Sequence, residues 1–413
     1  MGETNRGTIA TMNQPQIAYI SFDIVPAPKG AAIHIAAFVR ALGAAFGNVE
    51  LVTVSPNWEA MDPQERYPNV MQTALPAVGK TLIDRVMYFR TMLGSWFKNK
   101  RFDVVHIRSI YEGFPIALQK EKCCDRLIFE VNGLPSIELK YRYPAVADDR
   151  ELLQKLHAQE QICLDAADLI ITPSGVTRDY LEGRQVPRAK ICVIPNGVDL
   201  DIFTPTPQQA SAVNLEENFP YHLIYFGTLS AWQGVNIAIE ALAQVNERFP
   251  AKLTAIGQAR SQQIERLQKL ANKLGVSENL RILSPMSQGN LVQQIHQADA
   301  IVAPLTPNDR NLIQGCCPLK VLEGMATATP TIATNLPVVR EIGGDREHFL
   351  LVKPGSAGSL KDAIVEYHSQ PQFAARLARN ARQRIETHYT WQQAGDALIA
   401  AYHRLGIPSV SYN

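Results

Sequence analysis

The stretch PLKVLEGMATATPTIATN, residues 318–335, places a helix signal directly before a strand signal. Pro318 suits the start of a helix, because the N–H that it lacks would have no partner there in any case. The β-branched segment 330–335 is typical of a buried strand. Short runs of this kind that alternate with helical segments are the pattern of parallel sheets covered by helices, so the stretch predicts an α/β fold.

The same alternation runs along the whole chain and predicts two doubly wound domains. The expected strands are 16–22, 49–55, 103–109, 126–132, 168–174 and 190–196 in the first half, and 221–227, 251–257, 280–286, 300–305, 330–335 and 349–355 in the second. Between them lies a connection rich in Pro, Asn and Asp. We therefore expect an N-terminal Rossmann-like domain over 15–200, a C-terminal one over 215–388, and a remaining helix over 391–405.

Composition excludes several classes of function. The chain has 413 residues, of which 19% are charged, with a formal net charge of +1. Such a chain has no overall basic field for holding nucleic acid, so we expect no nucleic-acid partner. Its six cysteines form no C-x-x-C pair, which argues against a zinc site or a disulfide framework. Without a long apolar run or a secretory leader, the sequence predicts a cytoplasmic protein.

Ligands of doubly wound sheets bind beyond the carboxyl ends of the strands, so the loops there are the candidates for a site. VPAPKGAAIHI (25–35) follows the first strand, and Gly30 opens its helix. A similar glycine-containing loop before a helix occurs in FGTLSAWQGVNIAI (226–239), with Gly227 and Gly234. Unhindered amides at a helix N-terminus bind anions, although a tight turn with small residues explains each loop equally well.

A third loop contains Lys320 and Glu323, three positions apart on one helical face. Glu323 could accept two hydrogen bonds from a cis-diol such as a ribose, while Lys320 neutralises a diphosphate beside it. The backbone amides of Leu319, Lys320 and Val321, which follow Pro318, are expected to point out of the helix N-terminus. The alternative is an ordinary ion pair on a helix surface.

Three further patterns have two readings each. AVGKT (77–81) ends like a phosphate-binding P-loop but lacks its first glycine, and DLD (199–201) resembles a metal-binding pair but is explained more simply as turn chemistry. The segment 80–101 has an apolar stripe with basic residues around it. It could make a peripheral contact with an anionic membrane, or it is a domain helix with a solvated basic face.

The motifs IPNGVDLDIFTP (194–205), YFGTLSAWQGVNIAIEAL (225–242) and PLKVLEGMATATPTIATNLPVVREI (318–342), in this order and spacing, resemble the retaining nucleotide-sugar glycosyltransferases of family 4. The resemblance implies the GT-B fold, in which two Rossmann-like domains face each other across a cleft. It also implies that the C-terminal domain holds most of the donor, and that the helix 391–405 crosses back to the N-terminal domain.

Carried over by position, the resemblance implies that Glu323 holds the donor ribose and that the amides of 319–321 hold the diphosphate. Gly30 and Ala31 correspond to the loop that closes over the phosphates from the N-terminal side. Pro285 and Met286 correspond to the loop that receives the nucleobase. The expected co-substrate is a nucleotide-diphosphate sugar, with a UDP-sugar as the first candidate. No cofactor and no metal ion are expected.

The chain departs from the family pattern at four positions. Thr228 and Gln233 stand where many members have an Arg and a Lys that bind the diphosphate, and Gly315 replaces the first glutamate of the E-x7-E motif. Asn132 stands where a histidine is common; it can hydrogen-bond sugar hydroxyls but cannot take a proton as histidine does.

These departures leave the diphosphate without its usual cations. We infer that Lys320 supplies the missing charge, with Lys29 or Arg108 helping when the cleft closes. Without a carboxylate pair for double displacement, we expect transfer of a hexose to the hydroxyl of a glycan, lipid-linked or small-molecule acceptor, with retention of configuration. The alternatives are a weak or inactive nucleotide-sugar- or glycan-binding protein and a nucleotide-sugar epimerase.

Overall fold

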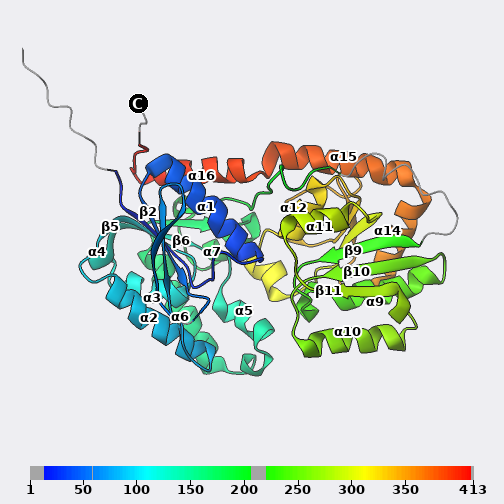
Figure 1. The fold of residues 1–413 in the computed structure, drawn as a ribbon, viewed down its shortest axis with the longest axis horizontal. Coiled ribbons are helices and arrows are strands. Elements are labelled where there is room, and N and C mark those ends of the chain that lie inside the picture. Colours follow the sequence, from blue (N-terminus) through cyan, green and yellow to red (C-terminus); the bar gives the residue numbers. More distant parts are fainter. Residues whose placement is uncertain (1–13, 58, 206–219, 411–413) are drawn as a thin grey trace, which may run out of the picture.

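Two parallel-stranded α/β domains lie side by side in the computed structural model (Figure 1). It describes residues 14–57, 59–205 and 220–410, and within them the strands form one sheet of eight and one of six. The strand orders are β3-β4-β2-β1-β5-β6-β7-β8 and β11-β10-β9-β12-β13-β14. In each sheet the order reverses beside the first strand of the domain, between β1 and β5 and between β9 and β12, which is the doubly wound arrangement. The predicted fold class is confirmed.

The N-terminal domain is built from strands of mostly apolar residues, with helices on both faces of the sheet. Its strands are β1 (Ile17–Ile20), β2 (Val49–Val54), β3 (Met61–Tyr67), β4 (Val70–Leu75), β5 (Phe102–Ile107), β6 (Cys124–Glu130), β7 (Leu169–Thr172) and β8 (Ile191–Val193). Its helices are α1 (Gly30–Phe46), α2 (Leu82–Trp96), α3 (Ile110–Leu118), α4 (Lys120–Cys123), α5 (Pro135–Arg142), α6 (Arg150–Ala166) and α7 (Gly175–Gly183).

The C-terminal domain repeats this construction. Its strands are β9 (Tyr221–Phe226), β10 (Ala251–Ile256), β11 (Leu280–Leu283), β12 (Ala300–Ala303), β13 (Thr331–Thr334) and β14 (Leu350–Val352). Its helices are α9 (Val235–Asn246), α10 (Ser261–Lys273), α11 (Gln288–Ile295), α12 (Leu319–Ala326), α13 (Pro337–Arg340), α14 (Ala357–Ser369) and α15 (Pro371–His388), and α16 (Trp391–Arg404) follows them.

One part of the first sheet differs from the prediction. β3 pairs antiparallel with β4, and β4 joins the sheet by pairing parallel with β2. No strand was expected in this segment. β3 reads MDPQERY, and in the structure most of its residues are exposed. An edge strand of this kind carries polar residues and Pro, so it lacks the apolar pattern of a central strand.

Helix α2 contains two of the ambiguous patterns. Thr81 caps it, accepting from the Asp84 amide while the Asp84 side chain accepts from the Thr81 amide, so AVGKT ends at a capping box and not in a P-loop. The apolar stripe of 80–101, for which a domain helix was one of the two interpretations, packs inward: Val86, Phe89 and Leu93 are buried in the core. Throughout the described ranges no helix combines the length and apolar character needed to cross a bilayer.

Helix α16 belongs to the N-terminal domain in space although it follows the C-terminal domain in sequence. Figure 1 shows it in red beside the blue α1, while the orange α15 lies over the other domain. Its buried residues, among them Leu398 and Tyr402, join the core that α1 and β1 form. The Tyr402 hydroxyl lies 2.9 Å from Nδ1 of His106 on β5, so the contact reaches the middle of the sheet.

The two chain segments that join the domains are hydrogen-bonded to each other. The amide of Val198 donates to the carbonyl of Tyr389 (2.8 Å), and the amide of Trp391 donates to the carbonyl of Val198 (3.3 Å). Gly197 permits this approach, since a Cβ there would lie 2.3 Å from the Trp391 nitrogen. The domains are therefore connected by a double strand and not by a single linker.

We expect Gly197→Ala to lower the free energy of unfolding by about 2 kcal/mol or more, because the added methyl group overlaps the backbone of the second segment. Chemical denaturation followed by tryptophan fluorescence measures this, since Trp391 lies at the junction. Gly183→Ala is the matched control: a Cβ there meets nothing within 4 Å, so its effect stays below about 1 kcal/mol. Equal effects of the two variants would contradict the steric explanation.

Candidate functional site

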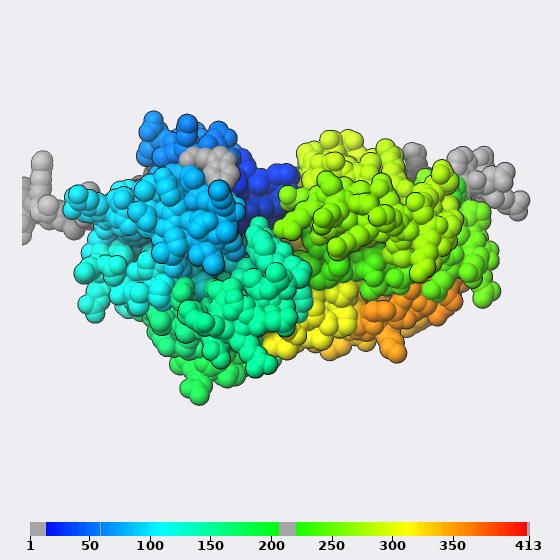
Figure 2. Space-filling view, turned by 90° about the horizontal axis from the view of Figure 1, so that it is seen from below, coloured from blue at the N-terminus to red at the C-terminus, as the bar shows by residue number. Residues whose placement is uncertain are grey.

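The candidate site lies between the domains, where the loops at the carboxyl ends of both sheets face each other. Gly30 of the N-terminal domain directly faces Leu319 of the C-terminal domain, because a Cβ on Gly30 would lie 2.9 Å from the Leu319 Cδ1. Ala31 follows Gly30 in the first turn of α1. Figure 2 shows the surface hollowed where the two halves meet, beside the dark-blue segment that contains the start of α1.

Lys320 is held inside this cleft by neutral groups. Its Nζ donates to the Tyr225 hydroxyl (2.8 Å) and to Oε1 of Gln233 (2.6 Å), and lies 4.2 Å from the centre of the Tyr225 ring. Gly227 leaves room for it, since a Cβ there would lie 3.2 Å from Nζ. Gln233 therefore anchors the lysine from the position where the family pattern has a cation.

Lys320 and Glu323 both have pKa values displaced toward neutrality. Burial, followed by the charge of Arg310, lowers the pKa of Lys320 to about 7. Burial raises the pKa of Glu323 to about 7, against the opposing effect of Lys320. Because the two charges influence each other, the pair titrates as a unit. Small changes in the surroundings, such as an arriving anion, can therefore change the charge of either group.

Helix α12 begins as predicted, with Pro318 at its N-cap, but its free amides are fewer than expected. The Val321 amide donates to the Pro318 carbonyl (3.0 Å), so it does not point out of the helix. The Val321 amide was expected to be free, but it is used because the first turn of α12 closes with a hydrogen bond of the i→i+3 type. The amides of Leu319 and Lys320 remain at the N-terminus as potential donors to an anion.

The remaining predicted residues of the C-terminal domain lie at the same edge of the sheet. Gly234 has φ +80 and caps α9, where a Cβ would collide with the carbonyl oxygen of Pro304 at 1.7 Å. The Thr228 side chain is exposed, and its carbonyl accepts from Tyr225. Pro285 and Met286 lie between β11 and α11; the proline is exposed and the methionine packs partly against the core.

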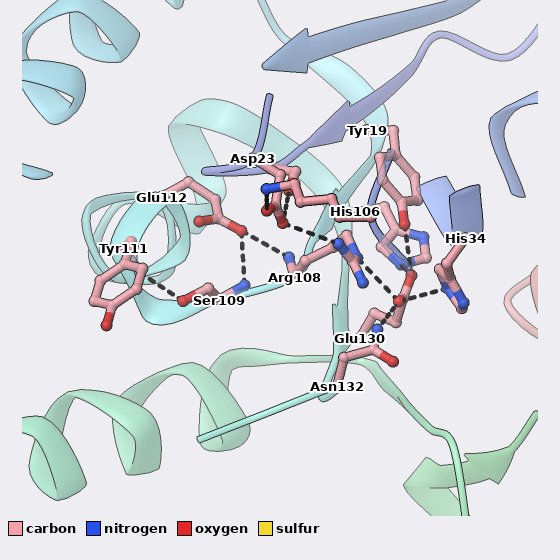
Figure 3. Close-up of polar contacts among 12 residues, drawn as sticks. Tyr19, Asp23, His34, His106, Arg108, Ser109, Tyr111, Glu112, Glu130 and Asn132 are labelled. Atoms are coloured by element: carbon pink, nitrogen blue, oxygen red, sulfur yellow. Dashed lines mark hydrogen bonds and ion pairs between the residues drawn. The ribbon is translucent and has the colours of Figure 1, made fainter. Parts of the chain in front are cut away.

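The N-terminal side of the cleft is organised around Glu130, which the sequence analysis did not single out. Its carboxylate is buried and accepts from the Tyr19 hydroxyl (2.6 Å) and from the Arg108 Nε (3.0 Å). Two histidines, His34 and His106, place Nε2 at 2.8 Å and 3.1 Å from it. Figure 3 shows these side chains converging on the carboxylate. Burial alone would raise the pKa of Glu130, but the charges of His34 and Arg108 hold it well below its ordinary value.

His34 lies between the Glu130 carboxylate and Asn196. Asn196 donates through Nδ2 to the Cys317 carbonyl (2.7 Å), which turns its Oδ1 toward Nδ1 of His34 (2.8 Å). Nδ1 of His34 is then the donor to Oδ1 of Asn196. This chain of contacts links the N-terminal sheet to Cys317, which directly precedes α12.

Arg108 and Lys29, proposed as helpers of Lys320, are engaged elsewhere. Arg108 is buried between Glu130 and Asp23 (Nη1 to Oδ2, 3.2 Å), and Lys29 pairs with Asp23 (2.6 Å). These contacts make Arg108 part of the domain core and correct that expectation. Asn132 donates through Nδ2 to Glu130, and Figure 3 shows its amide oxygen directed away from that carboxylate. The oxygen can accept a hydrogen bond from a ligand hydroxyl.

Gly315, at the position of the missing glutamate, is a structural requirement. It has φ +85, and a Cβ there would lie 2.5 Å from Oγ1 of Thr177 on α7 of the other domain. A carboxylate that contacts this loop comes from Glu138 on α5, which pairs with Arg310 (2.7 Å) and accepts from Gln314 (2.9 Å). The sequence analysis did not identify Glu138 or Arg310, because their contact crosses the domains.

Two other candidate chemistries find no support in the geometry. Asp199 accepts from the amides of Asp201 and Ile202, which makes DLD a turn, and the part of the chain that is described holds no group of three His, Cys, Asp or Glu side chains placed for a metal. Cys316 and Cys317 are buried, and burial raises the pKa of both thiols. They pack at the base of the site.

Comparison with known proteins agrees with the two-domain fold. Residues 28–202 match the family described as Glycosyltransferase Family 4, and residues 208–384 match Glycosyl transferases group 1. The chain is 25% identical to the D-inositol 3-phosphate glycosyltransferase of Corynebacterium urealyticum, over 74% of this chain and 72% of that protein.

Solved structures share the fold. The sucrose-phosphate synthase from Thermosynechococcus elongatus superposes with a TM-score of 0.79 at 21% identity, over 95% of this chain and 99% of that one. Anabaena HepE in complex with UDP-glucose superposes with a TM-score of 0.71 at 14% identity, over 94% of this chain and 100% of that one. Both domains of the present chain thus have counterparts in GT-B structures.

Two buried carboxylates should respond to pH in opposite directions. Glu130 has a lowered pKa, so its contribution to stability is present above the ordinary carboxyl pKa and is lost as the pH falls through its folded value. Burial raises the pKa of Glu112 to about 8, and its Oε2 has no hydrogen-bond partner among the described residues. Its contribution is complete below the ordinary carboxyl pKa and is lost as the pH rises toward 8.

Glu130→Gln should therefore lose about 3 kcal/mol at neutral pH, because it leaves His34 and Arg108 without their counter-charge. Glu112→Gln should gain stability relative to the wild type between about pH 5 and about pH 8. Urea denaturation at several pH values compares the two variants. A destabilising effect of Glu112→Gln that grows with pH would refute the assignment of a neutral carboxyl group.

Proposed function

Since the chain belongs to family 4 of the glycosyltransferases and has the GT-B fold, we propose that it transfers a hexose from a nucleotide-diphosphate sugar to an acceptor hydroxyl, with retention of configuration and without a metal ion. The observation that supports this most directly is the arrangement at α12. Lys320 and Glu323 lie on one helix at the carboxyl edge of the C-terminal sheet, with Gly30 of the other domain against the helix start.

The proposed donor is a UDP-sugar, as in the HepE complex with UDP-glucose. Its diphosphate would lie between the Gly30 loop and the amides of Leu319 and Lys320, where the helix dipole and the lysine ammonium favour negative charge. Glu323 would accept hydrogen bonds from the ribose hydroxyls. Pro285 and Met286 would border the nucleobase.

Lys320 supplies the charge that a metal ion would otherwise provide to the leaving group. Its pKa of about 7 in the ligand-free protein means that a bound diphosphate draws a proton onto it. The ammonium then stabilises the negative charge that develops as the bond to the sugar breaks. The proposal of metal independence rests on this group and on the two amides.

The proposed chemistry is a same-face substitution. The bond between the anomeric carbon and the diphosphate oxygen breaks, the acceptor oxygen bonds to the same face of the carbon, and the departing diphosphate oxygen takes the acceptor proton. Asp23 and Glu130 are both neutralised by cations, so neither is free to act as a covalent nucleophile. The amide oxygen of Asn132 would orient a sugar hydroxyl.

The first test is nucleotide release from UDP-, GDP- and ADP-sugars by the wild type and by Glu323→Ala, with chelator present and candidate glycans, inositol phosphate and hexose phosphates offered as acceptors. We expect release from one donor, with at least a tenfold loss in the variant, because a ribose held by one carboxylate loses its charge-assisted hydrogen bonds. Proton NMR of the product should show the anomeric configuration of the donor. Inversion would refute the proposed substitution, and an absolute requirement for metal would refute metal independence.

Donor affinity should also have an optimum near neutral pH. As the pH rises through about 7 the free Lys320 loses its proton and affinity falls; as the pH falls below about 7 Glu323 becomes neutral and affinity falls again. Calorimetric titration with the donor diphosphate across the pH range measures both limbs. Lys320→Met should remove the alkaline limb and Glu323→Gln the acid limb. Unchanged affinity in Lys320→Met would exclude the lysine from the diphosphate site.

A further inference from the structure

Arg310 occupies the cleft in a position that the family pattern does not assign. It lies on the short π-helical turn Arg310–Gln314, between β12 and α12, at the carboxyl edge of the C-terminal sheet. Its guanidinium carbon lies 5.2 Å from the centre of the Trp232 ring, in the loop that follows β9. Trp232 directly precedes Gln233, which holds Lys320, so the aromatic ring and the lysine anchor belong to one turn.

The guanidinium is oriented from the opposite domain. Its Nε donates to Oε1 of Glu138 on α5, at 2.7 Å, and Oε1 also accepts from Gln314. The guanidinium also contacts the buried Cys316 thiol, and the donors that remain on its terminal nitrogens can engage a phosphate. Stacking on an aromatic ring fixes the plane of a guanidinium without using its donors. Arg310 thus has a fixed plane, and it has more N–H donors than its contacts with Glu138 and Cys316 use.

Arg310 and Lys320 lie close enough for the charge of the arginine to lower the pKa of the lysine. Arg310 is paired with Glu138, and Glu323 acts on Lys320 against the effect of Arg310, but the two groups that hydrogen-bond Lys320 are neutral. An anion that contacts both cations would lower their mutual repulsion. The loop after β9 offers no cation of its own, because Thr228 and Gln233 are uncharged.

We propose that Arg310 is the second cation of the donor site and binds the terminal phosphate of the donor diphosphate, with Glu138 as the residue that positions it. The inference rests on the proposed function, because it requires a nucleotide diphosphate between Gly30 and α12. Lys320 and Arg310 then approach the diphosphate from two loops of one domain. They replace the Arg and Lys that the family pattern places after β9.

The same contact couples catalysis to closure of the domains. Lys140 pairs with Asp309, and the Tyr141 hydroxyl accepts from the Asp309 amide (2.9 Å), so α5 carries three adjacent contacts to the arginine turn. Figure 2 shows the blue-green segment with α5 against the C-terminal half. When the domains separate, Glu138 leaves Arg310. The arginine is therefore aligned for the leaving group only in the closed form.

Calorimetry with UDP, GDP and ADP and with their monophosphates tests the role of Arg310. In Arg310→Met we expect the preferred diphosphate to bind at least tenfold more weakly, and the matching monophosphate less than threefold, because the lost contact is with the terminal phosphate. Arg310→Lys should recover part of the difference. Arg188→Met, which removes a surface arginine paired with Glu182, is the control and should bind like the wild type.

Steady-state kinetics test the role of Glu138. Glu138→Gln keeps an oxygen that accepts from Nε and should retain kcat within about threefold. Glu138→Ala removes it and should lower kcat at least tenfold, with a smaller change in KM for the donor. An equal loss of kcat in Glu138→Gln and Glu138→Ala would show that the charge of Glu138 matters and not its hydrogen bond. That result would overturn the positioning role proposed for Glu138.

The outcomes separate the two levels of proposal. If the wild type binds no nucleoside diphosphate, the proposed function fails and this inference fails with it. If the wild type binds one and Arg310→Met binds it equally well, the inference alone is overturned. Thermal unfolding of each variant verifies that it is folded. If Arg310→Met is unstable, the affinity of Arg310→Lys and the kcat of Glu138→Gln are compared with those of the wild type instead.

Discussion

A buried carboxylate, Glu130, determines how the N-terminal half of the cleft is built. An ionised carboxyl group in the interior needs several donors, and Glu130 obtains them from β1, α1, β5 and its own loop, through Tyr19, His34, Arg108 and Asn132. These donors fix the loops at the carboxyl ends of three strands relative to one another. Through His34 and Asn196 the same network reaches the backbone beside α12, so the two halves of the cleft share one set of hydrogen bonds.

The positive charge of the cleft comes from places other than the loop after β9. Thr228 and Gln233 are neutral there, and Gln233 holds the Lys320 ammonium that extends from α12. The turn before α12 carries Arg310 against Trp232. The loop after β9 is thus neutral, and the cations at this sheet edge come from α12 and from the turn before it. Electrostatic stabilisation depends on where charge lies and not on which strand bears it.

Much of the fold could be predicted from the sequence, because the positions of strands, helices and turns depend on local sequence patterns. The short apolar runs predicted the strands of both sheets. Gly30, Gly227 and Gly234 predicted the turns at the points where the strand order reverses. Local patterns cannot show which side chains are in contact in the folded protein. Arg108 was predicted to be a free cation, but it is paired with Glu130 and Asp23. Glu138 contacts Arg310 from the other domain. A carboxylate within the apolar run RLIFEVN and a histidine within DVVHIRS were the available signals for the Glu130 network.

Helix α16 has a consequence for how the chain acquires its structure. Leu398 and Tyr402 fill the core beside α1, and Tyr402 contacts His106 in the middle of the sheet. A ribosome makes this helix after the entire C-terminal domain, so the N-terminal domain emerges with an uncovered apolar face and waits for its last element. The whole second domain is therefore synthesised while the first still lacks one of its core elements. The domain that is synthesised first is the last to receive all of its residues.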